Sequence, residues 1–365
     1  YDSYGNPLEV GKTDGIKITY VWGFDSTVPL AKVINASYSD IEALSSFGSG
    51  FTLTGNLSTQ QTDDLRTLSN TMVSTYVYDP LIGMTSQQDA RGYTMSYEYD
   101  EFNRLKFIKD HDNYILSKNE YHYAAQSSYV KTTSYKVPTL DGLTGAIANH
   151  TLVDDDKMES ITHFDGLGRA KQSIAKQVGG DKQHIVVPMF YDDYGRQVEE
   201  YLPMQSLVTG STALDYIDNT TLIASQKTHY DAKYSGEWAN VSDVNAFSKK
   251  HFEASPLNRV LEQGAPGEDW KVDEASNTDH TIKFDYQLNS ANEVRLFDVT
   301  FINSNTEDPQ LGYDGYYSAN ELFKTITKDE NWQSGQTHSQ DHTTEEFTNS
   351  QGQVVLKRTY DKGAA

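Results

Sequence analysis

The residues most able to do chemistry in this 365-residue chain are its carboxylates, since Asp and Glu number 52 against 30 Lys and Arg. Two neighbouring acids are the pattern used in glycoside hydrolysis, where one protonates the leaving oxygen and the other attacks or activates water. The candidate pairs are Glu98/Asp100, Asp192/Asp193 and Glu199/Glu200. The alternative assigns the aspartates to turns and the glutamates to a solvated strand face. We favour it, because this Asp recurs along the chain whereas a catalytic dyad is needed once.

The histidines and the remaining acidic clusters do not show established metal-ligand spacings. Asp341-His342 followed by Glu345-Glu346 is the nearest cluster, while Asp154-Asp155-Asp156 lacks the ordered oxygen spacing of an EF-hand loop. No GxSxG, P-loop or dinucleotide-binding motif follows a strand-like stretch. We therefore predict no catalytic residue, no metal and no cofactor. The histidines considered are His111, His122, His163, His184 and His342.

One short phrase recurs, with an aromatic residue and Asp ahead of Gly or Asn and then Arg. Its clearest copies are YEYDEFNRL (97–105), THFDGLGR (162–169) and FYDDYGR (190–196). Weaker copies are YDSYGNPL (1–8), EASPLNRVL (253–261) and FTNSQGQVV (347–355).

The phrase predicts a β-hairpin. Asp or Ser opens a tight turn because its side chain hydrogen-bonds the backbone just ahead. Gly or Asn closes it at a position that needs a positive φ, as in a type I turn with a G1 bulge. Turn chemistry does not require the Arg, whose recurrence suggests a repeated ion pair or stacking contact. The predicted turn residues are Asp100, Asn103, Arg104, Asp165, Gly168, Arg169, Asp192, Gly195, Arg196, Asn258 and Arg259.

Between these copies the chain alternates apolar and polar residues, which predicts a mainly β fold of antiparallel hairpins. The predicted strands cover 15–24, 72–78, 94–99, 129–137, 281–288 and 293–302. Two short helices are expected near 39–70, at 39–46 with Ser39 or Asp40 as the cap and at 62–69. The polar stretch 205–250 is predicted to be a loop or insertion. We divide the chain into a β segment with a helical insertion, 1–150, and a second β-rich domain, 151–365.

Composition limits the partners. A net charge of −22 repels phosphate backbones, so we expect no nucleic-acid partner. The chain has no cysteine, which excludes disulfides and thiolate chemistry. No stretch approaches the roughly 20 apolar residues that span a bilayer, so no membrane insertion is expected. Because it opens on Tyr1 and stops at Ala365 without an obvious closing element, we interpret it as a fragment of a longer polypeptide.

These phrases resemble the YD repeat of bacterial RHS proteins, which are related to toxin-complex shell proteins and to animal teneurins. Longer stretches resemble one subgroup of large, surface-secreted RHS-repeat proteins: 79–105, 161–175, 251–270 and 321–332. The resemblance implies a curved or spiralling antiparallel sheet that forms part of a hollow shell, usually around a C-terminal polymorphic toxin. The family's self-cleaving core has no match here. Asp79-Pro80 is superficially similar to its cleavage site but lies in a strand-like context upstream of the repeats.

The leading hypothesis is a non-enzymatic structural segment of a secreted or cell-surface bacterial RHS protein, whose shell encapsulates a C-terminal toxin or cargo. Its partners would be the rest of the same polypeptide and that cargo. The alternative is an adhesin-like surface module that binds glycans or neighbouring cells. A hydrolase is a third, less favoured hypothesis.

Overall fold

A computed structural model describes residues 1–11, 15–124, 128–140, 145–146, 150–206, 214–302 and 307–360. The fold is mainly β, and the strand pairs of these residues are antiparallel, as predicted. The chain forms two compact units. Unit 1 contains Tyr1–Arg169 and Ser173–His184, and unit 2 contains Ala170–Gln172 and Ile185–Ala365. Their extents differ from the segments 1–150 and 151–365 expected from sequence.

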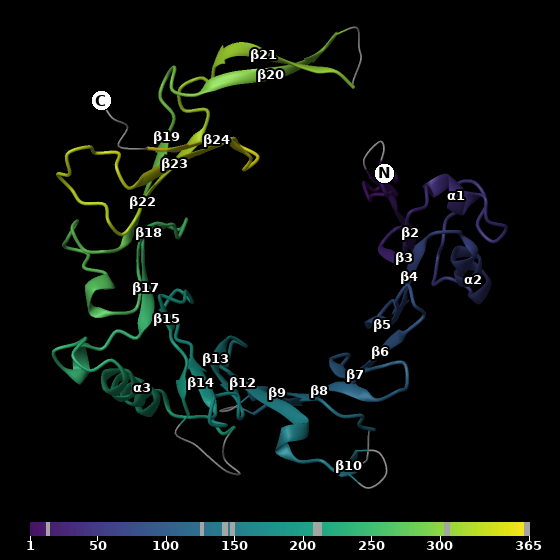
Figure 1. The fold of residues 1–365 in the computed structure, drawn as a ribbon, viewed down its shortest axis with the longest axis horizontal. Helices are drawn as coiled ribbons and strands as arrows, with labels where there is room; N and C mark the ends of the chain where they lie inside the picture. Colours follow the sequence, from purple (N-terminus) through teal and green to yellow (C-terminus); the bar gives the residue numbers. More distant parts are fainter. Residues whose placement is uncertain are drawn as a thin grey trace. The chain divides into compact units, whose positions relative to one another are not determined.

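Unit 1 is built on one sheet whose strands follow chain order, so that most neighbours in the sheet are joined by a hairpin (Figure 1). A separate short pair is formed by β10 (Gly145–Ala146) and β11 (His150–Thr151). The strands of the main sheet in this unit are β1 (Glu9–Val10), β2 (Ile18–Gly23), β3 (Val28–Ile34), β4 (Met72–Asp79), β5 (Gly83–Gln88), β6 (Thr94–Tyr99), β7 (Leu105–Lys109), β8 (Ile115–His122), β9 (Ser128–Tyr135), β12 (Lys157–Phe164) and, from Ser173 onward, β13 (Ala170–Ala175).

Both helices expected near 39–70 are present in the connection between β3 and β4. Helix α1 (Tyr38–Glu42) is capped by Ser37, not by Ser39 or Asp40, because Asp40 is the third helical residue and completes a capping box with Ser37. Helix α2 (Thr59–Thr67) has Ser58 as its cap, with Gln61 in the same reciprocal role. Ile41 of α1 and Leu65 of α2 are buried in a hydrophobic core that also contains residues of β2, β3 and β4. The other buried members of this core are Val21, Ala31, Val33, Ala36 and Val73.

Unit 2 contains a seven-stranded antiparallel sheet in the order β15-β17-β18-β19-β22-β23-β24, a β14–β16 pair and a separate two-stranded hairpin. The hairpin, β20 (Arg295–Phe301) with β21 (Pro309–Tyr316), lies in the connection between β19 and β22. Val294, Leu322 and Phe347 form a buried cluster in this unit. The remaining strands are β14 (Ile185–Pro188), β15 (Glu199–Tyr201), β16 (Met204–Gln205), β17 (Phe247–Phe252), β18 (Val260–Gly264), β19 (Ile282–Leu288), β22 (Phe323–Lys328), β23 (Thr343–Thr348) and β24 (Val354–Thr359).

The stretch 205–250, expected to be a loop or insertion, contains a well-formed helix, α3 (Asn219–Lys233). Its N-terminus is capped by Asp218, and its buried residues Leu222, Gln226 and Tyr230 recur every four positions. The helix was missed because Gln226 breaks the apolar pattern. That amide is buried but donates to the carbonyls of Leu202 and Ala246. Short 3-10 turns occupy Asp154–Asp156 (η1), Val241–Asp243 (η3) and Glu268–Trp270 (η4).

None of the helices in the described ranges has the length and apolar character needed to cross a membrane.

Candidate functional site

The recurring phrase folds into one hairpin turn with a fixed set of hydrogen bonds. In the turn that starts at Asp192, the Gly195 N–H donates to the Asp192 carbonyl at 2.9 Å, and the Asp192 N–H donates to the Arg196 carbonyl at 2.9 Å. One carboxylate oxygen, Oδ1, also accepts the N–H groups of Tyr194 and Arg196, at 3.0 and 2.8 Å. The aspartate side chain therefore accepts two backbone N–H groups that a tight turn would otherwise leave unpaired. Within the described residues the same bonds occur in turns that start at Asp2, Asp89, Asp100, Asp110, Asp165, Asp192 and Asn349.

The fourth turn position has a positive φ wherever this turn occurs. Asn103 has a φ of 59°, Gly168 of 79° and Gly195 of 78°. Most residues that carry a Cβ are strained in this left-handed backbone conformation. Gly adopts it without strain, and Asn tolerates it. The exchange between Gly and Asn that the sequence shows is thus a backbone requirement.

The fifth residue, Arg, pairs with the aspartate that opens its own turn. Nε donates to the second carboxylate oxygen at 2.7 Å for Arg104 and Asp100, and at 2.8 Å for Arg169 and Asp165. The Arg196–Asp192 pair has the same geometry at 2.8 Å. The hydrogen bond from Arg104 lowers the pKa of the Asp100 carboxyl below its usual value, although desolvation opposes the shift.

The guanidinium groups also stack on aromatic rings of neighbouring strands. The Cζ atom of Arg104 lies 4.3 Å from the ring centroid of Tyr121 on β8, and that of Arg196 lies 4.6 Å from Phe252 on β17. A cation over an aromatic face is favourable by about 0.5–1 kcal/mol at an exposed site. The Arg therefore connects its own turn to the next hairpin. Both contacts left open from the sequence, the ion pair and the stacking, are present for these two residues.

The copy at 253–261 differs from the others. Asn258 has a φ of 53° and its N–H donates to the Ser255 carbonyl, but Arg259 pairs with Glu253, not Ser255. The loop between Glu253 and Arg259 is two residues longer than the loop between Asp192 and Arg196. The carboxylate that pairs with Arg259 therefore precedes the turn, whereas in the other copies it belongs to the first turn residue. Nη1 of Arg196 donates to the Asn258 side chain at 2.9 Å, so two turns of the repeat are in direct contact.

Two further turns escaped the sequence reasoning. Asp89–Gly92 and Asp110–Asn113 share the hydrogen bonds but have Tyr93 and Tyr114 in place of Arg. The signal that could have found them is Asp followed three residues later by Gly or Asn, without the aromatic lead-in and without Arg.

In the candidate pairs Glu98/Asp100 and Glu199/Glu200, each carboxylate has its own separate contact, and Asp192 of the pair Asp192/Asp193 holds its turn. Glu98 accepts from Lys109, whereas Asp100 holds its turn. Glu199 accepts the Tyr201 hydroxyl, and Glu200 pairs with Lys250. Successive strand residues point to opposite faces of a sheet, which separates the two adjacent glutamates. The arrangement joins strands rather than presenting two acids to one bond.

The candidate metal clusters are also dispersed. Asp154 and Asp155 pair with Lys176 and Lys182, and His342 lies 3.3 Å from Asp329. Among the described residues, no three His, Asp or Glu side chains gather closely enough to hold a metal ion. Asp79-Pro80 lies in the β4–β5 turn, where the Ile82 N–H donates to the Asp79 carbonyl.

The other predicted histidines have structural neighbours. His122 stacks on Tyr129, and the edge of the buried His163 ring meets the same tyrosine. His184 accepts the Gln177 N–H, while His111 lies beside Asp112.

A group of buried carboxylates was not anticipated from the sequence. Glu159 on β12 is only 7% exposed and contacts the ammonium groups of Lys131 on β9, Lys157 and Lys176. Burial alone would raise its pKa, but hydrogen bonds from Lys131 and Lys176 outweigh that effect and lower the pKa to about 2. In unit 2, Glu345 on β23 likewise meets Lys324 on β22 and Arg358 on β24. Ion pairs thus cross neighbouring strands in the interior of both units.

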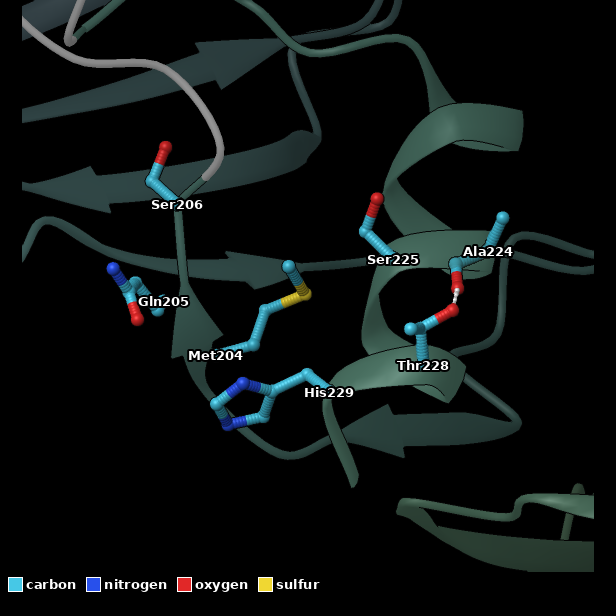
Figure 2. Close-up of a pocket in the computed structure, with 7 residues that line it drawn as sticks. All are labelled: Met204, Gln205, Ser206, Ala224, Ser225, Thr228 and His229. Atoms are coloured by element: carbon cyan, nitrogen blue, oxygen red, sulfur yellow. Dashed lines mark hydrogen bonds between the residues drawn. The ribbon is translucent and has the colours of Figure 1, made fainter. Parts of the chain in front are cut away.

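A cavity of about 550 Å³ lies between β16 and α3 (Figure 2). The hydroxyl groups that α3 contributes bond the backbone of the helix itself, since Ser225 donates to the Thr221 carbonyl and Thr228 to the Ala224 carbonyl. Burial, with a smaller contribution from Lys233, lowers the pKa of His229. Figure 2 shows the His229 ring beside Met204. This is a mixed surface of helix and strand side chains rather than a set of groups aimed at one reacting atom.

The carboxylate of Asp192 should determine how firmly its hairpin closes. We expect Asp192→Ala to speed amide hydrogen exchange at Tyr194 and Arg196 by roughly tenfold, because both N–H groups lose their acceptor. Asp192→Asn retains an acceptor, as Asn349 does in its own turn, and loses only the charge that pairs with Arg196, so its exchange should quicken less. Hydrogen exchange read by NMR would measure all three proteins. Equal protection in all of them would contradict this role.

Part of the chain matches a known family of protein domains. The family model described as Domain of unknown function (DUF6443) matches residues 131–284, which is less than half of the chain. A search of curated proteins found no match.

Weak structural similarity extends to components of Tc toxins. The Tc holotoxin pore of Photorhabdus luminescens, with a TccC3 mutation, is 12% identical over 93% of this chain and 18% of that chain, with a TM-score of 0.17. The TcdB2-TccC3 crystal structure is 11% identical over 96% of this chain and 22% of that one, with a TM-score of 0.15. This chain thus spans about a fifth of those chains.

Proposed function

We propose that this chain is a non-enzymatic structural segment of a secreted or cell-surface RHS/YD-repeat protein, forming part of a β-shell around a C-terminal toxin or cargo. One observation carries the proposal: the same hairpin turn recurs through both units, and its Asp and Arg are used to close the turn and to hold the next strand. Asp and Arg side chains that are engaged in holding the sheet together at successive turns support a wall rather than a reaction centre.

The buried ion pairs support the same role. A shell wall has to keep its strands in register, and Glu159 with its lysines links β9, β12 and the end of β13. A pair that loses one partner leaves an uncompensated buried charge, so such contacts favour one arrangement of strands over a shifted one. The resemblance of the repeated phrases to YD repeats is the reason for naming an RHS-type shell.

Limited proteolysis of the full-length polypeptide that carries this sequence tests the proposal. We expect a C-terminal segment to resist protease in the intact protein and to become digestible in the triple variant Asp100→Ala, Asp165→Ala, Asp192→Ala, which loosens three turns. A surface variant such as Glu120→Gln should leave protection unchanged. A full-length protein in which no segment is protected would overturn the shell role.

A glycan-binding adhesin module is the second candidate, favoured by the β20–β21 hairpin. Phe297, Phe301 and Tyr313 are 48%, 46% and 58% exposed on this two-stranded sheet, and aromatic faces of this kind stack on sugar rings. Binding on a glycan array that disappears in Phe297→Ser/Tyr313→Ser would support this function, which the proteolysis experiment leaves untouched.

A further inference from the structure

One edge of the unit 1 sheet carries large apolar side chains at the tips of its turns. The third turn residue is Tyr4, Leu81, Phe102 or Leu167, with exposures of 74%, 87%, 76% and 79%. Tyr123, in the connection after β8, is 71% exposed. A type I turn accepts most residue types at this position, so turn geometry does not explain the choice. We call these five residues the tip edge.

Strand pairing places these residues on the same edge. Consecutive antiparallel strands turn alternately at the two edges of a sheet. The turn after β4 (Asp79↔Gly83), the turn after β6 (Tyr99↔Leu105) and the connection after β8 (His122↔Tyr129) therefore share one edge. Ser128↔Phe164 places the turn after β12 there as well. The Asn6 side chain donates to the Ser26 carbonyl in the β2–β3 turn, which brings Tyr4 to this edge too.

The middle of the tip edge is one continuous surface. The Arg104 guanidinium lies 4.9 Å from the Phe102 ring centroid and 5.1 Å from that of Tyr123. Tyr123 also lines a cavity of about 510 Å³ that extends to the turn with Leu167 at its tip. Among the described residues that line this cavity are His122, Tyr123, Tyr129, Phe164 and Gly168. Exposed aromatic anchors beside a cavity of this size are the features of a protein-binding surface.

The charge of this edge indicates the chemistry of the partner. Its two arginines, Arg104 and Arg169, are neutralised by the aspartates of their own turns. Four carboxylates beside the tips form no ion pair among the described residues: Asp2, Asp25, Asp79 and Glu101. The opposite edge differs, because its tight turns present Arg91 and Asp112 at the tip. An acidic, apolar edge disfavours a second copy of itself and an anionic membrane, and it complements a basic surface.

We propose that the tip edge is a docking surface for a protein partner that presents apolar side chains among lysines and arginines. The partner's anchor side chain would enter the cavity beside Tyr123, while its cations would neutralise the four carboxylates. This docking surface does not depend on whether the chain encloses a cargo.

The probes are three synthetic ten-residue peptides that alternate Lys with Leu, Lys with Ser, and Glu with Leu, titrated into the full chain by calorimetry. We expect the Lys/Leu peptide to bind at least tenfold more tightly than the Lys/Ser peptide, and the Glu/Leu peptide not to bind. Tyr4→Ser, Leu81→Ser, Phe102→Ser and Leu167→Ser together should abolish the advantage of Leu. The matched control is Ile16→Ser, Met72→Ser, Val153→Ser and Val178→Ser, at exposed apolar positions away from the tips, which should preserve it.

Several results would overturn the proposal. One is equal loss in the tip and control variants, which would mean that any exposed apolar residue serves. Another is equal binding of the Lys/Leu and Lys/Ser peptides, which would mean that the peptides bind through their charges alone. Binding to phosphatidylcholine vesicles, or dimerisation detected by light scattering, that is lost only in the tip variant would assign the edge to lipid or to a second copy instead.

Discussion

Replacing Glu159 with glutamine is expected to lower the free energy of unfolding of unit 1 by about 3 kcal/mol at pH 7. The carboxylate is 7% exposed and contacts three lysines from β9, β12 and the end of β13. Glutamine keeps the shape of the side chain but leaves those ammonium groups without their counter-charge. Urea denaturation, followed by hydrogen exchange at β9 and β12, measures the difference.

The stability that Glu159→Gln loses relative to wild type should decrease as the pH falls. The lysines lower the pKa of Glu159 from 4.5 to about 2, so the folded state favours the ionised form. A lowered carboxyl pKa contributes stability that is fully present above about pH 4.5 and is lost as the pH falls toward 2. The difference between wild type and Glu159→Gln should therefore be constant from pH 5 to 8 and shrink in acid.

Glu120→Gln is the matched control, since Glu120 on β8 also pairs with a lysine but its side chain is 45% exposed. We expect it to change stability by less than about 1 kcal/mol, because water screens an exposed pair. A Glu159→Gln protein as stable as the control, or a difference that persists at pH 2, would show that the buried carboxylate does not hold the strands.

Phe347→Ala is expected to lower the free energy of unfolding of unit 2 by about 3–5 kcal/mol. The ring is fully buried and packs with Val294 and Leu322, while Lys324 and Arg358 place their charges 5.3 and 4.8 Å from its centroid. Alanine would leave a cavity in this cluster and remove the face on which both cations rest. Chemical denaturation read by hydrogen exchange at β22 to β24 gives the value.

Phe323→Ala tests whether burial, rather than the loss of any phenylalanine, accounts for the effect. Phe323 lies on the adjacent strand β22 but is 57% exposed, so we expect a change within about 0.5 kcal/mol. Phe347→Leu should fall between, at about 1–1.5 kcal/mol, because it keeps most of the apolar volume. Equal effects at positions 347 and 323 would contradict the assignment of the core.

The hairpins could be predicted because their information is local. An Asp that accepts N–H groups two and four residues ahead, and a Gly or Asn with positive φ, are satisfied within five residues. The two helices near 39–70 could be predicted in the same way. Ser37 was missed as the cap of α1 because its capping box begins two residues before Ser39, the first cap candidate. Helix α3 was missed because its buried Gln226 is polar and finds its carbonyl partners 20 and 24 residues away.

The role of Arg could only be half predicted. Its aspartate partner lies four residues earlier, but the ring on which it stacks comes from a later hairpin, as Phe252 does for Arg196. The lysines around Glu159 are likewise 28, 2 and 17 residues away in the chain. No spacing rule connects such positions, because strand pairing rather than sequence distance brings them together.

The sequence by itself thus determined the antiparallel hairpins and their turn residues, since each turn satisfies its own backbone within a few residues. The tertiary structure decided which carboxylates are buried and paired, which arginines link neighbouring hairpins, and which turn tips remain uncovered on a shared edge. These properties depend on which strands lie side by side. The resulting pattern separates carboxylates that hold the sheet together from side chains that are left to meet a partner.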